Sequence, residues 1–168
     1  MRIGGVDLPE KINLNKVDLK LNGAAIRTKF FIHTYVIALY AAKRITDEKT
    51  AIESDIERSL RMQISTPLAT SKVVSENIQS GMKDGLGSLY YKQEDLIEDL
   101  RRVIEESGVQ YKDFIDIYYT AKGELKLYKN GKEIYSNKDG KLFAQTIFSM
   151  YVGKRPKDPK IKKALLGG

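Results

Sequence analysis

Polar and apolar residues alternate along the first part of the chain, from residue 11 to residue 21. This period of two is typical of half-buried β-strands. The sequence from residue 30 to residue 42 is instead apolar on both faces and rich in aromatic and β-branched residues, which predicts a central strand. Small residues at 23–25 predict a bend or a bulge between the two segments.

The middle of the chain predicts two helices separated by a strand. Thr46 to Ser54 is expected to form a short helix capped by its first threonine. Ser59 to Thr66 alternates between apolar and polar residues and is expected to be a strand. Pro67 is expected to begin a longer helix that ends at Gly85, with the preceding threonine as its cap. Its predicted apolar face consists of Val73, Val74, Ile78 and Met82.

The second half of the chain predicts a helix, three strands and two further helices. Gln93 to Ser107 carries its apolar residues at helical spacing and is followed by a glycine that stops the helix. A meander of strands is expected at 113–120, 124–129 and 132–136, with a hairpin turn at Asn130-Gly131. The last helices are expected at 141–152 and 159–166. Because strands and helices come in blocks, we expect an α+β fold, an antiparallel sheet with helices on one face.

Arg27 lies inside the nearly continuous apolar stretch from Leu21 to Ala42, together with Tyr35. An arginine is almost never fully buried unless something pairs with it. Three interpretations are open: Arg27 reaches solvent, it pairs with an internal acid such as Glu76, or it binds an anionic ligand. In one straight strand Arg27 and Tyr35 would lie roughly 26 Å apart, at ~3.3 Å per residue, so they converge only if the chain turns or bulges near Thr28-Lys29.

Composition excludes several kinds of chemistry. The chain of 168 residues is expected to form a single domain, 1–168, with a sizeable core. It has no cysteine, and His33 is its only histidine, which excludes cysteine zinc sites and histidine-rich metal sites. We find no nucleophile elbow, no P-loop and no dinucleotide-binding glycine pattern. We therefore expect no metal, no cofactor and no catalytic residue.

The net charge is +7, and one local cluster of basic residues spans 154–163. It is interrupted by two prolines and contains no aromatic residue. We interpret it as a solvated tail, with an anion-binding patch as the alternative, and expect no nucleic-acid partner. No charge-free apolar run reaches the ~18–20 residues that span a bilayer, and residues 1–12 carry no signal-peptide core.

Three stretches carry a resemblance to a known family. They are Leu21–Arg27 with Tyr35–Tyr40, Val74–Asn77, and Gly140–Ala144 continuing to Gly153–Pro156. In order and spacing the chain resembles the chalcone isomerase superfamily, most closely its bacterial chalcone isomerase-like branch. The resemblance implies an open-faced β-sandwich: a large antiparallel sheet with helices packed on one face and a ligand cleft between them.

The resemblance also implies a set of ligand-binding residues. Arg27 falls on the arginine that isomerases and fatty-acid binders share, and Tyr35 on the tyrosine that helps the binders to hold a lipid carboxylate. Isomerases use a tyrosine and a lysine where this chain has Thr70 and Val73, whereas Asn77 matches the family's asparagine. Thr70, Val73 and Asn77 are expected to line the helix side of the cleft.

The function that these residues favour is non-catalytic binding of a small apolar carboxylate, such as a fatty acid. A guanidinium fork with one hydroxyl donor suits a carboxylate. One alternative is an isomerase or intramolecular lyase acting on a chalcone-like unsaturated carbonyl compound. The other is an interaction domain with a vestigial cleft, which predicts a core filled by side chains such as Met62, Met82 and Phe148. The family implies a periplasmic or exported protein, with a cytoplasmic one as the alternative, and the oligomeric state stays open.

Overall fold

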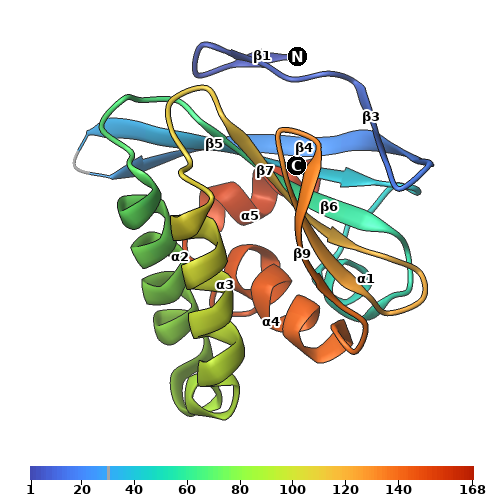
Figure 1. The fold of residues 1–168 in the computed structure, drawn as a ribbon. Coiled ribbons are helices and arrows are strands. Elements are labelled where there is room, and N and C mark those ends of the chain that lie inside the picture. The colour runs from blue at the N-terminus through green and yellow to red at the C-terminus, as the bar shows by residue number, and fades with distance from the viewer. Residues whose placement is uncertain (30) are drawn as a thin grey trace.

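A seven-stranded antiparallel sheet forms the frame of the molecule, and its helices cover one face (Figure 1). The computed structural model describes residues 1–29 and 31–168, so Phe30, at the start of the predicted central strand, lies outside the described residues. Strand order follows chain order. The strands are β3 (Lys11–Leu14), β4 (Val17–Lys29), β5 (Ile32–Ala41), β6 (Arg58–Ile64), β7 (Phe114–Tyr119), β8 (Leu125–Lys129) and β9 (Lys132–Asn137).

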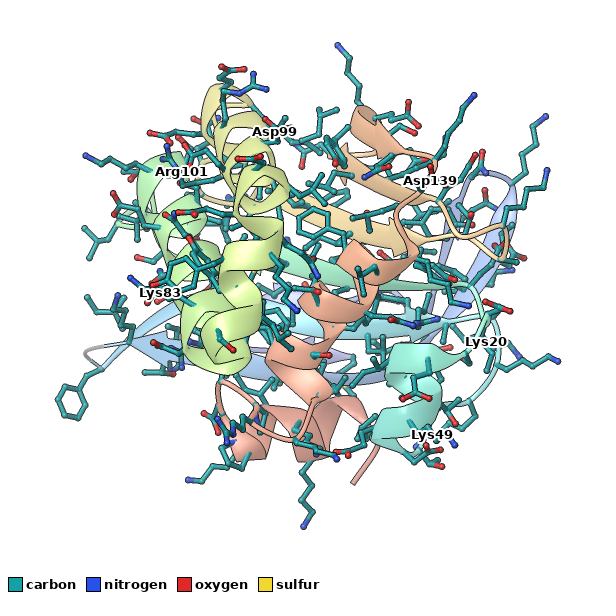
Figure 2. The ribbon with its side chains drawn as sticks, turned by 90° about the horizontal axis from the view of Figure 1, so that it is seen from below. Lys20, Lys49, Lys83, Asp99, Arg101 and Asp139 are labelled. Carbon is teal, nitrogen blue, oxygen red and sulfur yellow. The ribbon has the colours of Figure 1, made fainter. Side chains whose placement is uncertain are left out.

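The helices lie together below the sheet, and Figure 2 shows this helical layer from below. They are α1 (Glu48–Glu53), α2 (Ser71–Leu86), α3 (Glu94–Glu106), α4 (Lys141–Val152) and α5 (Pro159–Leu165), with a 3₁₀ segment, η1 (Gly87–Gln93), between α2 and α3. Lys83 on α2 and Asp99 on α3 lie on the outer, exposed side of this layer. The opposite face of the sheet carries a small N-terminal ribbon of β1 (Arg2–Ile3) and β2 (Val6–Asp7).

Strand β5 is buried on both faces, as its apolar sequence predicts. Tyr35, Ile37 and Leu39 belong to the core beneath the helices. Val36 and Ala38 belong to a second, smaller core beneath the N-terminal segment. Because large helices cover only one face, the predicted α+β arrangement of an antiparallel sheet with helices on one side is confirmed.

Asn22 and Gly23 anchor the C-terminal helix to the sheet. The buried Asn22 amide donates to the carbonyls of Ile45 and Leu165, at 2.8 and 2.7 Å, and its oxygen accepts from the Ile45 amide at 2.8 Å. A Cβ on Gly23 would lie 2.0 Å from the Ala164 carbonyl oxygen, so only glycine permits this approach. The predicted irregularity is also present, since the pairing of β4 with β5 shifts register between Leu21 and Gly23.

Two helix starts differ from those that the sequence predicts. Helix α1 is capped by Asp47 rather than Thr46: its side chain accepts from the Thr50 amide at 2.8 Å. Helix α2 begins at Ser71 rather than at Pro67, and its cap is Thr70. The later strands and helices confirm the predictions within one or two residues.

Two arginines of the sheet, Arg58 and Arg61, are buried, whereas Arg27 is only partly buried. Arg58 is 1 % exposed, donates to three backbone carbonyls in and after α1, and stacks between Tyr119 and Phe148. Arg61 makes a two-pronged ion pair with Asp116, both bonds measuring 2.8 Å. Both cations are therefore held by partners within the fold.

Candidate anion-binding site

The β4–β5 hairpin places Arg27 directly opposite Tyr35. Strand β4 ends at Lys29 and β5 starts at Ile32. The chain therefore turns between Arg27 and Tyr35, which the meeting of these two residues requires. The register shifts after the Arg27–Tyr35 pair, because His33 is the next residue to find a partner and Thr34 is the extra residue of a bulge. The condition for convergence is thus met, and Arg27 and Tyr35 lie side by side on neighbouring strands.

Tyr35 meets a second buried tyrosine, Tyr151 of α4. Their hydroxyl oxygens lie 2.9 Å apart, and both residues are 0 % exposed. Burial raises the pKa of both phenols, while the positive charge of Arg27 opposes the rise. Both hydroxyls therefore stay protonated at neutral pH. One of the two protons lies in the hydrogen bond between the oxygens, and the Tyr151 hydroxyl is also placed to donate to the Met62 sulfur at 3.6 Å.

Lys157 brings a second cation to this place. Its amide donates to the Met150 carbonyl at 2.8 Å, which folds the segment after α4 back onto the helix, and its Nζ donates to the Asn77 carbonyl on α2 at 2.8 Å. A Cβ on Gly81 would lie 3.1 Å from this Nζ, so the missing side chain makes room for the lysine. Burial, followed by the charges of Arg27 and Lys29, lowers the pKa of Lys157 to about 8.

Asn77 connects α2 to both lysines of this cluster. Its side-chain oxygen accepts from Lys29 Nζ at 3.0 Å, and its carbonyl accepts from Lys157. The side chain is 7 % exposed. Asn77 therefore positions one ammonium group from β4 and one from the C-terminal segment beside α2.

The cluster is electropositive. In the described part of the chain, no acidic side chain forms an ion pair with Arg27, and Glu76 on α2 points to solvent instead of pairing with it. The nearest acidic influence on Lys157 is the charge of Asp84, which only partly offsets the lowering of its pKa. Among the same described residues, no three His, Asp or Glu side chains converge to hold a metal ion. The arrangement suits an anion.

A cavity of about 190 Å³ opens between the hairpin and the start of α2. It is predominantly apolar, and Lys29 and Asn77 connect it with the cationic cluster. This volume is below the ~300–1,000 Å³ of typical small-molecule sites. Its walls are Lys29, Ile32, Thr34, Thr66, Leu68, Ala69, Val73 and Asn77.

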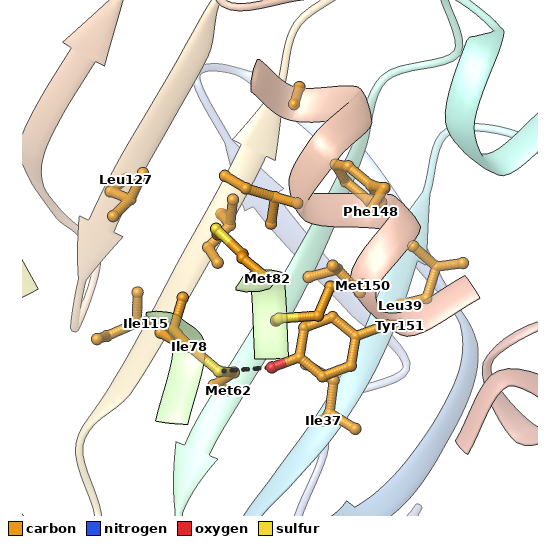
Figure 3. Close-up of a cluster of buried hydrophobic side chains, with 14 of the residues drawn as sticks. Ile37, Leu39, Met62, Ile78, Met82, Ile115, Leu127, Phe148, Met150 and Tyr151 are labelled. Carbon is orange, nitrogen blue, oxygen red and sulfur yellow. Dashed lines mark hydrogen bonds between the residues drawn. The ribbon is translucent and has the colours of Figure 1, made fainter. Parts of the chain in front are cut away.

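The space between the sheet and α4 is filled (Figure 3). Met62, Met82 and Phe148 are each 0 % exposed, and Met150 is 2 % exposed. This part of the molecule agrees with the dense core that a vestigial cleft predicts. Methionine side chains are unbranched and adapt to different shapes, so the same core also contains the parts best able to rearrange beside Tyr151.

Of the residues predicted on α2, only two face the cavity. Val73 is 37 % exposed and lines it, which corrects the prediction that Val73 belongs to the buried face of the helix. Asn77 lines it as well. Thr70 does not: its hydroxyl caps α2 by accepting from the Val73 amide at 3.3 Å. Thr70 therefore has a structural role that the shifted helix start explains.

Tyr151, Lys157 and Lys29 are the members of the cluster that the sequence did not indicate. Tyr151 is an apolar-run residue of α4, and Lys157 belongs to the basic segment 154–163 that we interpreted as a solvated tail. The interpretation as a solvated tail is wrong for Lys157, which packs against α2. It agrees with Lys154 and Arg155, which are exposed.

The fold and the sequence were compared with those of known proteins. A crystal structure of a fatty-acid-binding protein from Arabidopsis thaliana superposes with a TM-score of 0.74 at 18 % identity, covering 97 % of this chain and 92 % of that one. This likeness confirms the fold expected from the sequence. No curated protein sequence matches the chain. The sequence profile of the chalcone isomerase-like family, however, matches residues 1–167. The chain therefore belongs to the chalcone isomerase-like family.

Proposed function

We propose that residues 1–168 act as one chalcone isomerase-like domain that binds a small apolar carboxylate, such as a fatty acid, without transforming it. Arg27 is the counter-ion of the carboxylate, and Tyr35 is the hydroxyl that donates to it. Lys157 adds a second positive charge, and Asn77 holds the lysines in place. Val73 contributes an apolar wall near the cavity mouth, and Thr70 acts only as the helix cap.

The observation that carries this proposal is the placement of the Arg27 guanidinium beside a buried pair of neutral hydroxyls, with no acidic ion-pair partner in the described residues. When Tyr151 donates to Tyr35 instead of to the Met62 sulfur, the Tyr35 proton is free to donate to a carboxylate oxygen. A bound carboxylate then receives a charged fork and a hydroxyl in a site shielded from water, where such bonds are strongest. The fatty-acid-binding protein that shares the fold supports the same ligand class.

The acyl chain needs more room than the cavity of about 190 Å³ offers. Met62 and Met150 lie beside Tyr151, and Met82 belongs to the same core (Figure 3). Moving these flexible side chains opens space next to the hydroxyl pair at a low cost in strain. We therefore propose that the carboxylate binds first at Arg27 and that the chain is accommodated by rearrangement of the methionines.

The proposal does not include catalysis, because the helix side of the site lacks the groups for it. Cyclisation of a chalcone needs donors that orient a phenolate and stabilise charge on the carbonyl oxygen. Thr70 is used as a cap, and Val73 offers neither a phenol nor a cation. Incubation with a chalcone is expected to give no cyclisation above the uncatalysed rate.

The direct test is native mass spectrometry of the purified protein, before and after it is offered dodecanoate. The wild type is expected to carry one fatty acid, which solvent extraction identifies. Arg27→Met is expected to lose it. Arg102→Met is the matched control, because Arg102 lies exposed on α3, away from the cluster.

Two results would overturn the proposal. If Arg27→Met retains dodecanoate as well as the wild type does, Arg27 is not the counter-ion. If the wild type stays empty when dodecanoate is added, the core does not open for a ligand. The interaction domain with a vestigial cleft is then the better interpretation.

A further inference from the structure

Phe31 projects from the tip of the β4–β5 hairpin. It is 102 % exposed, and its φ of +63° puts a bulky aromatic residue in the left-handed region. Such a conformation costs about 1–3 kcal/mol and persists only where the surrounding structure enforces it. The pairing of β4 with β5 enforces it here, so the fold holds an apolar ring in water.

Other exposed apolar side chains gather at the same end of the sheet. Three of them, with exposures of 40 %, 66 % and 37 %, line the mouth of the cavity beside the hairpin, and a fourth, at 45 %, is on the loop before β7. We call this set the apolar end. It consists of Phe31, Ile32, Leu68, Val73 and Tyr111.

Backbone hydrogen bonds hold these loops next to one another. The Ser65 amide donates to the Thr34 carbonyl at 3.2 Å, which ties the loop after β6 to the hairpin. The Lys112 amide donates to the Ile64 carbonyl at 3.1 Å, which ties the loop before β7 to β6. The apolar end is therefore one surface, although its members come from three connections, the start of β5 and a helix.

Positive charge flanks the apolar end. Lys72 is exposed in the first turn of α2, and the exposed Lys112 follows Tyr111. The acidic residues nearby are Glu76, which is exposed one turn further along α2, and Asp113, which Lys129 neutralises at 3.6 Å. The chain as a whole carries +7. Exposed apolar side chains with a basic rim match the surface of an anionic bilayer.

We propose that the apolar end docks on the surface of an anionic lipid bilayer, with Phe31 inserted between the headgroups and the lysines facing lipid phosphates. The mouth of the cavity then opens toward the membrane. The inference goes beyond ligand binding and does not depend on it, because bilayer docking requires only surface residues. If both proposals hold, the membrane is the source from which an apolar carboxylate enters the site.

The chain contains no tryptophan, so a single introduced tryptophan reports on one position. Phe31→Trp is expected to show a blue-shifted emission with mixed phosphatidylcholine–phosphatidylglycerol vesicles and a much smaller shift with phosphatidylcholine alone. Leu142→Trp is the control, because Leu142 is 65 % exposed but lies at the start of α4, away from the hairpin. Its emission is expected to stay unchanged with both kinds of vesicle.

Co-sedimentation with the same vesicles measures the affinity. Phe31→Asp is expected to weaken binding by roughly 10- to 100-fold, the amount expected for losing the burial of one large apolar side chain. Its thermal unfolding is expected to be unchanged or slightly raised, because the Phe31 side chain makes no buried contact and aspartate tolerates the left-handed backbone better than phenylalanine does. Leu142→Asp is expected to bind like the wild type.

Three outcomes would overturn the inference. The first is equal emission of Phe31→Trp with and without anionic vesicles. The second is an equal loss of vesicle binding in Phe31→Asp and Leu142→Asp, which would mean that binding is not localised. The third is a blue shift of Phe31→Trp that depends on protein concentration without lipid, which would assign the apolar end to contact between copies of this chain. Loss of docking with dodecanoate binding intact would leave the proposed function standing.

Discussion

Arg27 on β4 and Arg61 on β6 belong to one sheet and flank the same strand, β5, yet they are satisfied in opposite ways. Arg61 meets Asp116 across two bonds of 2.8 Å and lies over the Phe114 ring, its guanidinium carbon 4.2 Å from the ring centre. Arg27 meets hydroxyl groups and a second cation, with no ion pair in the described residues. A folded protein accepts an unneutralised cluster of cations only at a cost. The difference separates a cation that holds the fold from one that is available to a ligand.

The largest expected effect comes from breaking the satisfied pair. Asp116→Asn leaves Arg61 without its counter-charge on the face of the sheet opposite the helices, where Asp116 is 0 % exposed. Removal of one partner of a buried ion pair costs about 3–5 kcal/mol. Urea unfolding is expected to show this loss, and a loss below ~1 kcal/mol would mean that solvent reaches the pair.

The next largest effect concerns two glycines of α2 one turn apart. A Cβ at Gly81 would lie 2.7 Å from the Met150 sulfur and 3.1 Å from Lys157 Nζ, whereas one at Gly85 meets its nearest atom at 3.7 Å. Gly81→Ala is expected to destabilise by about 1–2 kcal/mol through overpacking. Gly85→Ala is expected to stabilise by about 0.5–1 kcal/mol through helix propensity.

Thermal unfolding of the two variants checks this prediction, since both carry the same substitution in the same helix. Gly81→Ala is also expected to weaken dodecanoate binding, because it displaces the Lys157 ammonium. Equal stability changes in the two variants would contradict the close packing of Lys157 against α2.

The affinity for dodecanoate is expected to fall as pH rises through 8. The pKa of Lys157 is lowered to about 8 by burial and neighbouring cations, and a bound carboxylate raises it again. Binding then takes up a proton above pH 8, and a raise of about one unit makes the affinity at pH 7 roughly tenfold higher than at pH 10. Calorimetry across this range measures the slope.

Lys157→Met is expected to remove that slope, while Lys163→Met, an exposed lysine of α5, keeps it. In the ligand-free protein, folding stability has the opposite pH dependence to dodecanoate affinity. The unfolded chain binds this proton more tightly, so stability rises with pH between about 8 and the ordinary lysine value. A slope that survives Lys157→Met would assign the titration to another group.

The smallest expected effect is that of Arg27→Met on stability. The substitution removes a cation from a cluster that already contains Lys157, so it relieves repulsion while it loses little packing. The unfolding free energy is expected to change by less than ~1 kcal/mol, against several for Asp116→Asn. A loss as large as that of Asp116→Asn would mean that Arg27 stabilises the fold as Arg61 does, and would contradict the difference between the two arginines.

Local patterns predicted most of the fold. The meander β7–β9 follows from alternation and from the Asn130-Gly131 turn, whose φ values of +50° and +84° are those of a two-residue hairpin. The start of α2 was wrong because a proline after a threonine imitates a capped helix start. Thr70, whose hydroxyl accepts from the Val73 amide, offers the same chemistry a few residues later.

The site was only partly predictable, for a physical reason. Arg27 and Tyr35 belong to one hairpin, so a turn alone brings them together. Tyr151 and Lys157 arrive through packing of α4 and the C-terminal segment across the sheet, and the hydroxyl contact joins residues 116 positions apart. No local pattern encodes such a contact, and a lysine that is buried by tertiary structure has the same sequence signal as a solvated one.

The account's central claim is that the cluster around Arg27 recognises the negative charge of a carboxylate. Carbon-13 NMR of carboxyl-labelled dodecanoate bound to the protein measures this directly, because the carboxyl shift follows its protonation during a pH titration. The account predicts a bound carboxyl pKa below its value in water, and a rise of that pKa in Arg27→Met. A bound carboxyl whose pKa is raised in the wild type, as in an apolar pocket without cations, would contradict it.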